Sequence, residues 1–433
     1  MPREMRPLMT RFTSLPIQQL PVGSILRAPI IEPGDTNTKL LAGGTEITSA
    51  FLKKLITRGI ARVAISDGDM ASINAFRPQG NSRHPAPSHL YRQSISFNDV
   101  SKKIDQIVHS EVSTVGESGD PFSMKIEKGS TQSYEQGLEE QWSCESEEQI
   151  LKLSNLFEAT LDGQSVDVQF LKKQCEIMLQ RICIDQDAFV CFAASPFPSG
   201  YPSRHAYHTT CMALAIGVEC GLDNEHLLQL GMGSLIHDVG MGLIGLKQFE
   251  SPTTILAKGL KNLADHPVAA LKATDFREEE FTDAARLVTY QIHERLDGSG
   301  YPRGRLSHQI HPLAKIAAVA DAFVGMLTPR PHRMGVQGYY AVKKILDETR
   351  EGKYDPKAVR GLLKATSLFP IGSYVKLTNE KHARVIRSNK SEYTKPTIEV
   401  WNGDDQETEP TVIDLCSQDT IAITGAIACP KAA

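Results

Sequence analysis

Histidine and aspartate side chains gather in one part of this 433-residue chain. Of its 13 histidines, nine lie between His205 and His332. His237 and Asp238 are adjacent in this stretch and directly follow apolar residues, so both polar groups are expected to be buried. Burying a polar group without a partner costs about 2–7 kcal/mol, and a bound metal ion removes that cost. Imidazole and carboxylate are typical ligands of Mn, Fe, Ni or Zn, so the doublet predicts a transition-metal site.

A further carboxylate repeats this situation. Asp321 stands at the end of the apolar run 316–320. A helix cap or a buried ion pair is the alternative explanation for such a residue. A lone histidine such as His205, His266 or His293 means little by itself, and it is the combination with the doublet that favours a metal site.

A second signal follows His293, where the sequence reads HERLDGSGYP over residues 293–302. The two glycines and the proline predict a tight, non-helical loop. Such a loop presents backbone N–H groups and lets a bulky ligand approach the chain closely. An ordinary helix–loop connection is the alternative.

These residues carry a resemblance to a known family. The order His205, His237-Asp238, Asp321 resembles the HD phosphohydrolase superfamily. Residues 293–302 resemble its HD-GYP branch, whose members hydrolyse bacterial cyclic di-GMP. The resemblance covers residues 203–347 and implies an all-α helical bundle that holds two, sometimes three, metal ions.

The resemblance also assigns roles to individual residues. It makes His205, His237, Asp238 and Asp321 the ligands of a first divalent metal ion, with Asp238 bridging to a second one at His266 and His293. His237 and Asp238 are then the catalytic residues, since two metal ions acidify a bridging water and polarise the phosphodiester. The residues expected to bind substrate are Asp297, Gly298, Gly300, Tyr301, Pro302, Arg330 and Arg333.

Four positions depart from the family pattern. Ile292 stands where the family has a histidine ligand of the second metal, and Met241 replaces a lysine. Val324 replaces an aspartate, and Tyr201 replaces the glutamate of the three-metal subgroup. The ligand set of the first metal is therefore complete, whereas that of the second lacks one histidine. We expect one or two ions (Fe, Mn or another transition metal) and a lowered activity.

Three functions stay open at this stage. The first is a metal-dependent phosphodiesterase that converts cyclic di-GMP to linear pGpG, GMP or both. The second is a degenerate, non-catalytic member that senses cyclic di-GMP or docks signalling proteins such as diguanylate cyclases. The third is an HD hydrolase that acts on another nucleotide.

The predicted fold is mainly α, with small accessory parts. Residues 1–73 are expected to form a small α/β domain and residues 74–140 a polar, disordered linker. A helical lead-in (141–200) precedes the HD-GYP-like domain (201–352), and residues 353–433 are expected to be β-rich because their apolar residues alternate. We expect strands near 373–377, 383–386 and 397–401.

Composition bounds the remaining possibilities. The formal net charge of −4, from 47 basic and 51 acidic residues, argues against binding to a nucleic-acid polymer. Eight cysteines without a CxxC pair indicate buried thiols in a reducing compartment, and no apolar run approaches 18 residues. We therefore expect a cytoplasmic protein without a membrane segment, whose helices before Ser195 could pair two chains into a homodimer.

Overall fold

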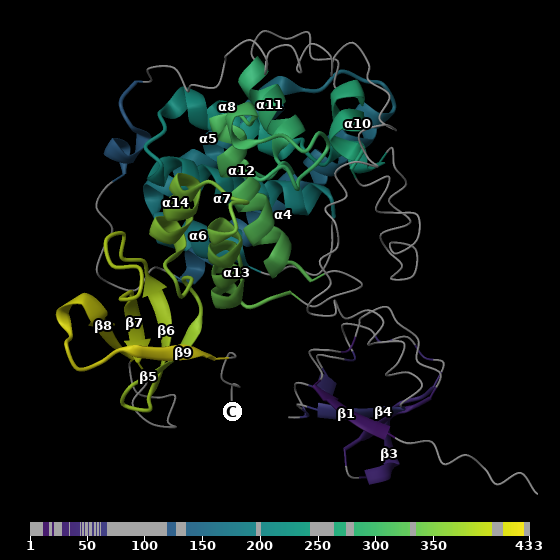
Figure 1. Ribbon diagram of the computed structural model, residues 1–433, viewed down its shortest axis with the longest axis vertical. Coiled ribbons are helices and arrows are strands. Elements are labelled where there is room, and N and C mark those ends of the chain that lie inside the picture. Colours follow the sequence, from purple (N-terminus) through teal and green to yellow (C-terminus); the bar gives the residue numbers. More distant parts are fainter. Residues whose placement is uncertain are drawn as a thin grey trace, which may run out of the picture. The chain divides into compact units, whose positions relative to one another are not determined.

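The computed structural model divides the chain into two compact units. One comprises residues 1–85, 246–260 and 329–335, and the other comprises the rest of the chain. The structure describes parts of residues 12–66, and residues 119–126, 136–195, 201–242, 264–273, 281–329, 335–400 and 410–427. Each unit is treated by itself below (Figure 1).

The first unit contains a four-stranded antiparallel sheet. Its strands are β1 (Phe12–Pro16), β2 (Ile30–Glu32), β3 (Asp35–Leu41) and β4 (Arg62–Ser66), in the order β1-β4-β2-β3. Apolar side chains such as Leu15, Ile30 and Val63 form its small core. Of the described residues between positions 45 and 55, Phe51, Lys54 and Leu55 have helical backbone, whereas Thr45 and Ile47 do not.

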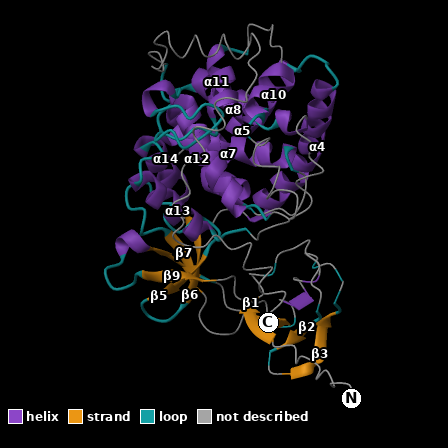
Figure 2. Cartoon of the chain, turned by 45° about the vertical axis from the view of Figure 1, so that its right-hand side comes forward, coloured by secondary structure: helices purple, strands orange, loops and turns teal. Residues whose placement is uncertain are grey.

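The second unit is mainly helical, which confirms the predicted fold class (Figure 2). Its α-helices are α4 (Gln136–Leu161), α5 (Val168–Ile184), α6 (Gln186–Ala194), α7 (Ser203–Glu219), α8 (Asn224–Leu235), α10 (His266–Ala273), α11 (Asp283–Gln291), α12 (Pro312–Leu327), α13 (Gly338–Arg350) and α14 (Pro356–Thr366). The described residues of this unit also contain the short 3₁₀ segments η2 (Phe122–Lys125), η3 (Val239–Gly242), η6 (Ser307–Gln309) and η7 (Leu415–Ser417).

Helix α7 lies at the centre of this bundle. It packs against α4, α5, α6, α8, α12 and α14, and it is buried on nearly all sides. A helix that is apolar all round belongs in a core, and α7 carries small and apolar residues on every face. Polar groups placed on α7 and on its neighbour α12 are therefore held away from water by the whole bundle.

The C-terminal part of this unit is a five-stranded antiparallel sheet. Its strands are β5 (Tyr374–Leu377), β6 (His382–Arg387), β7 (Thr397–Val400), β8 (Thr411–Asp414) and β9 (Ile423–Ile427), in the order β8-β7-β6-β5-β9. Alternate residues such as Val375 and Leu377 are buried, as the period-two pattern predicts. One residue of this sheet, Ile386, belongs to the helical core instead, so the sheet packs on the helices.

Two segments differ from what the sequence pattern suggested. The region 353–433 begins with helix α14, because Asp355 caps the helix through Lys357 and Ala358 and Pro356 occupies its first turn. The predicted linker ends in ordered chain: α4 begins at Gln136, and Phe122 is buried. Residues 74–118 of this linker lie outside the described residues, and the domain boundaries stay predictions.

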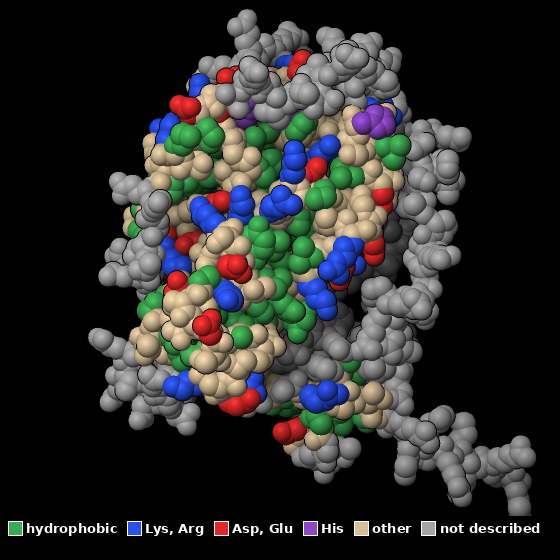
Figure 3. Space-filling model, turned by 60° about the vertical axis from the view of Figure 1, so that its left-hand side comes forward, with side chains coloured by type: hydrophobic (Ala, Val, Ile, Leu, Met, Phe, Trp, Pro, Cys, Tyr) green, Lys and Arg blue, Asp and Glu red, His purple; other side chains and the backbone are tan. Residues whose placement is uncertain are grey.

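The surface of the molecule carries mixed charge. On the face drawn in Figure 3, small groups of Lys and Arg side chains lie among apolar, neutral and acidic ones. Within the described part of the chain, no helix has the length and apolar character that crossing a membrane requires.

Candidate metal centre

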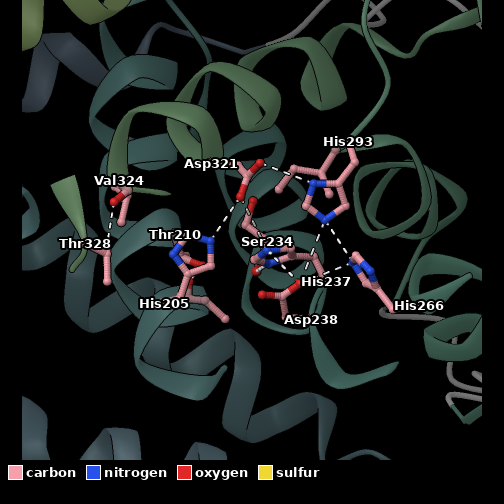
Figure 4. Close-up of polar contacts among 12 residues, drawn as sticks. His205, Thr210, Ser234, His237, Asp238, His266, His293, Asp321, Val324 and Thr328 are labelled. Atoms are coloured by element: carbon pink, nitrogen blue, oxygen red, sulfur yellow. Dashed lines mark hydrogen bonds and ion pairs between the residues drawn. The ribbon is translucent and has the colours of Figure 1, made fainter. Parts of the chain in front are cut away.

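The six predicted ligands converge inside the helical unit (Figure 4). His205 comes from the first turn of α7, and Asp321 from the middle of α12. The other four lie at ends of elements: His237 and Asp238 between α8 and η3, His266 at the start of α10, and His293 just beyond α11. All six residues are buried, and the most exposed is Asp321, at 9% of its whole-residue surface.

A first group of donor atoms surrounds one end of the cluster. His205, His237 and Asp238 each offer a donor within 4.8 Å of the others. The Oδ1 atom of Asp321 lies 3.0 Å from His205 Nε2 and 3.9 Å from His237 Nε2. These four residues are the predicted ligands of the first metal ion.

The hydrogen bonding of His237 defines which of its nitrogens is free. Its Nδ1 lies 2.7 Å from the carbonyl oxygen of Ser234, which can only accept, so Nδ1 carries the proton and donates. Burial lowers the pKa of His237 to about 4, so its ring is neutral. Nε2 therefore carries a lone pair, lies 3.4 Å from Asp238 Oδ1, and has no hydrogen-bond partner although it is buried. A lone pair that faces a carboxylate calls for a cation between them.

A second group of donors shares Asp238 with the first. Asp238 Oδ1 lies 3.2 Å from His266 Nε2 and 3.8 Å from His293 Nε2. The two imidazole nitrogens lie 2.9 Å from each other. Donors bonded to one metal ion at about 2.0–2.2 Å stand about 3–4.4 Å apart, depending on the angle at the metal, and the distances given above for both groups lie in this range. The residues present therefore suit the divalent metal that the resemblance implies.

A close backbone contact holds the second group together. Gly240 lies just after the doublet, and a Cβ atom at this position would stand 2.1 Å from the carbonyl oxygen of His266. Only glycine permits this approach of η3 to α10. The glycine after the doublet thus brings Asp238 and His266 within reach of the same ion.

The loop after His293 is fixed by its own side chains and backbone. The buried carboxylate of Glu294 accepts hydrogen bonds from the backbone N–H groups of Arg303 and Arg305, both at 2.8 Å. At Gly300 a Cβ atom would meet the backbone nitrogen of Arg295 at 2.3 Å, which explains why glycine is required there. Glu294 was not among the predicted site residues, although its place beside His293 was the available signal.

The predicted substrate-binding residues of this loop occupy different environments. The Tyr301 ring stacks on the His293 ring, with ring centroids 4.8 Å apart. The backbone N–H of Tyr301 donates a hydrogen bond to the backbone carbonyl of His293. Pro302 is buried behind it. Asp297 accepts hydrogen bonds from the N–H and hydroxyl of Ser299, and thus closes the turn at Gly298. Tyr301 therefore lies against the cluster, whereas Asp297 and Gly298 shape the turn.

The departures from the family pattern are buried apolar side chains. Ile292 and Val324 both belong to the hydrophobic core, and Met241 is fully buried in η3. The neighbour Gln291 does not replace the missing ligand, because its amide binds the backbone of Gln309 and His311. Tyr201 lies beside His205, with ring centroids 5.8 Å apart. Arg330 and Arg333 lie outside the described residues.

Comparisons with known proteins bear on this arrangement. A family model described as "HD domain" matches residues 191–358. The chain is 22% identical over 248 residues to "Cyclic di-GMP phosphodiesterase PA4108" of Pseudomonas aeruginosa, covering 57% of this chain and 59% of that protein. It is 28% identical over 171 residues to "Cyclic di-GMP phosphodiesterase response regulator RpfG" of Xanthomonas campestris pv. campestris, covering 40% and 45%.

A third relative is named for a different cyclic dinucleotide. The chain is 26% identical over 178 residues to "3'3'-cGAMP-specific phosphodiesterase 3" of Vibrio cholerae serotype O1, covering 41% of this chain and 37% of that protein. The chain thus spans about half the length of the curated relatives it matches. The model of the HD domain thus matches residues 191–358, and the segment from His293 to Pro302 is similar to the HD-GYP branch of that family.

Proposed function

We propose that this protein is a metal-dependent phosphodiesterase that hydrolyses cyclic di-GMP to linear pGpG, GMP or both. One observation carries the proposal: two groups of buried donors share Asp238, and the unpartnered Nε2 of His237 lies 3.4 Å from Asp238 Oδ1 and 3.9 Å from Asp321 Oδ1. His205, His237, Asp238 and Asp321 would hold one divalent ion, and Asp238, His266 and His293 a second. We propose Fe or Mn, since His/Asp sets favour such metals.

The bound ions would supply Lewis-acid activation of the phosphodiester and an acidified water. The protein's own groups have complementary tasks. Ser234, through its carbonyl, fixes the tautomer of His237 so that Nε2 stays available. Tyr301 covers one face of the His293 ring and excludes water from it. Glu294 holds the loop that carries Tyr301 in place through two backbone hydrogen bonds. Arg330 and Arg333 are proposed to bind phosphate.

The test measures metal content and turnover together. The protein is loaded with Mn²⁺ or Fe²⁺, its metal per chain is counted, and breakdown of cyclic di-GMP to linear products is followed. We expect His237→Ala to lose both metal and turnover, and the exposed His382→Ala, in the C-terminal sheet, to keep both. Two bound ions without turnover would contradict the proposal, and less than one ion per chain would contradict the ligand assignment.

A non-catalytic role in sensing or docking is the second candidate, and Ile292 favours it. Its side chain is fully buried in the hydrophobic core, so the second group lacks one ligand that the family pattern contains. Binding of cyclic di-GMP without hydrolysis, measured on the same metal-loaded protein, would support this candidate. Faster hydrolysis of 3'3'-cGAMP than of cyclic di-GMP would instead support an HD hydrolase that acts on another nucleotide.

The setting of the protein remains part of the proposal. We propose a cytoplasmic location, which agrees with the free thiols of the described cysteines. Binding to diguanylate cyclase-type signalling proteins and formation of a homodimer stay predictions.

A further inference from the structure

The two carboxylate oxygens of Asp321 face different groups of donors. Oδ1 lies 3.0 Å from His205 Nε2, within the first group. Oδ2 lies 3.2 Å from Nδ1 of His293, a residue whose other ring nitrogen belongs to the second group. Figure 4 shows Asp321 between His205 on one side and His293 on the other. Sequence reasoning placed Asp321 in the first group alone.

The chemistry of imidazole indicates what the contact between Asp321 Oδ2 and His293 Nδ1 does. A neutral histidine has one nitrogen with a proton and one with a lone pair. If His293 Nε2 offers its lone pair toward Asp238 and His266, then Nδ1 carries the proton and donates to Asp321 Oδ2. A carboxylate in this position orients the ring and raises the basicity of the ligating nitrogen.

The position of Asp321 makes this arrangement rigid. The residue lies in the middle of α12, a helix buried against α7, and its side chain is 12% exposed. His293 has little freedom of its own, because Tyr301 stacks on its ring and His266 lies 2.9 Å from its Nε2. The ring is thus held from three sides, and Asp321 provides the hydrogen-bond acceptor on the Nδ1 side.

We infer that Asp321 serves both metal groups: it is a ligand in the first through Oδ1 and the positioning residue of His293 in the second through Oδ2. This inference rests on the metal sites of the proposed function. It accounts for how the second group can hold an ion although Ile292 supplies no ligand, because the orienting carboxylate makes His293 a stronger donor. It also links the two groups, since one side chain must satisfy both.

The inference can be tested without a turnover assay, by comparing the metal affinity of a single variant with that of a double variant. His205→Ala removes a ligand of the first group and leaves the second intact, so the tight site that remains reports the second group. Adding Asp321→Asn to His205→Ala should then weaken Zn²⁺ binding at that site about 10–100-fold, the effect typical of a lost orienting partner. The affinity is measured by competition with a chromophoric chelator, and circular dichroism verifies that both variants are folded.

A second readout follows the His293 proton directly. In ¹⁵N-histidine-labelled, Zn²⁺-loaded protein, the Nδ1–H signal of His293 is assigned by its absence in His293→Gln. We expect this signal to be shifted downfield by the carboxylate and to move upfield in Asp321→Asn. An affinity change below about threefold with an unmoved signal would overturn the inference and leave the metal sites standing. Absence of Zn²⁺ binding in the unaltered protein would overturn the proposed metal sites as well.

Discussion

Two polar clusters in the same helical unit, one buried and one partly exposed, accommodate their charged groups in different ways. One attaches the C-terminal sheet to the helices. There the Nη1 atom of Arg387 lies 2.6 Å from Asp185 Oδ1 and 3.5 Å from Asp187 Oδ2. The Nζ atom of Lys390 lies 2.6 Å from Glu219 Oε1. The hydroxyl of Ser388 donates to Asp187 at 2.7 Å. Each carboxylate of this sheet anchor thus has a cation or a hydroxyl of the chain itself.

The metal centre contains a polar atom without such a partner. Its carboxylates face imidazoles, with Asp321 Oδ1 3.0 Å from His205 Nε2 and Asp238 Oδ1 3.2 Å from His266 Nε2. His237, however, is neutral, its Nε2 has no hydrogen-bond partner, and this atom lies 3.4 Å from Asp238 Oδ1. From this difference we infer how a functional polar cluster can be told from a structural one. The functional cluster needs a cation from outside the chain to satisfy its polar atoms.

The largest expected effect separates the two clusters by activity. Asp238→Asn should lower the turnover of cyclic di-GMP by at least about 10³-fold, because metal activation is worth several kcal/mol and about 1.4 kcal/mol is tenfold in rate. Asp187→Asn in the sheet anchor should leave turnover within about threefold. Initial rates with saturating Mn²⁺ measure both. Equal losses in the two variants would remove the distinction between the clusters.

Stability should respond in the opposite way. Arg387→Met removes this cation of the sheet anchor and leaves the partly exposed carboxylates of Asp185 and Asp187 without it. Breaking a buried pair costs about 3–5 kcal/mol and an exposed one about 0–1 kcal/mol, so we expect the free energy of unfolding to fall by about 1–3 kcal/mol. Urea denaturation measures it, and the metal content of the folded variant should be unchanged. A loss of metal in Arg387→Met would show that the sheet anchor also supports the metal centre.

Metal removal should affect only the metal centre. A ligand that binds the folded state alone stabilises it by about 2.7 kcal/mol at 100 times its dissociation constant. Adding Mn²⁺ to chelator-treated protein should therefore raise the midpoint of thermal unfolding, and Asp238→Ala should abolish this shift. Asp187→Asn, as the matched control, should keep it. If Asp238→Ala gains as much stability from Mn²⁺ as the unaltered protein, the ion binds elsewhere.

The sequence predicted which donor residues converge better than it predicted the contacts that support them. The six donors follow from residue types and from the order of a known motif, and neither depends on details of packing. The second contact of Asp321 could not be foreseen, because it depends on how α12 faces the loop after α11. Likewise, the start of α14, with Asp355 as its N-cap and Pro356 in its first turn, was visible in the sequence, but the strand-like alternation that follows concealed this helix.

The linker and the sheet anchor also contain contacts that could not be predicted from the sequence. Phe122 inserts into the helical core, and its N–H donates to the Leu222 carbonyl, although its surroundings in the sequence are polar. Arg387 pairs with an aspartate about two hundred positions earlier in the chain, a contact that no local pattern encodes. Local periodicity predicts elements, whereas long-range polar contacts are settled only by the packing of those elements.

The smallest expected effect tests whether the metal centre can be made more complete. Ile292→His should strengthen metal binding at the second group, by about tenfold, since it restores a ligand beside His293. The same change places an imidazole where an apolar side chain is fully buried, which should lower the free energy of unfolding by about 1–3 kcal/mol. Chelator competition measures the first effect and urea denaturation the second. A stability loss without a gain in metal affinity would mean that the side chain at position 292 faces the core in the variant as in the unaltered protein. The ion of the second group would then be held by Asp238, His266 and His293 alone.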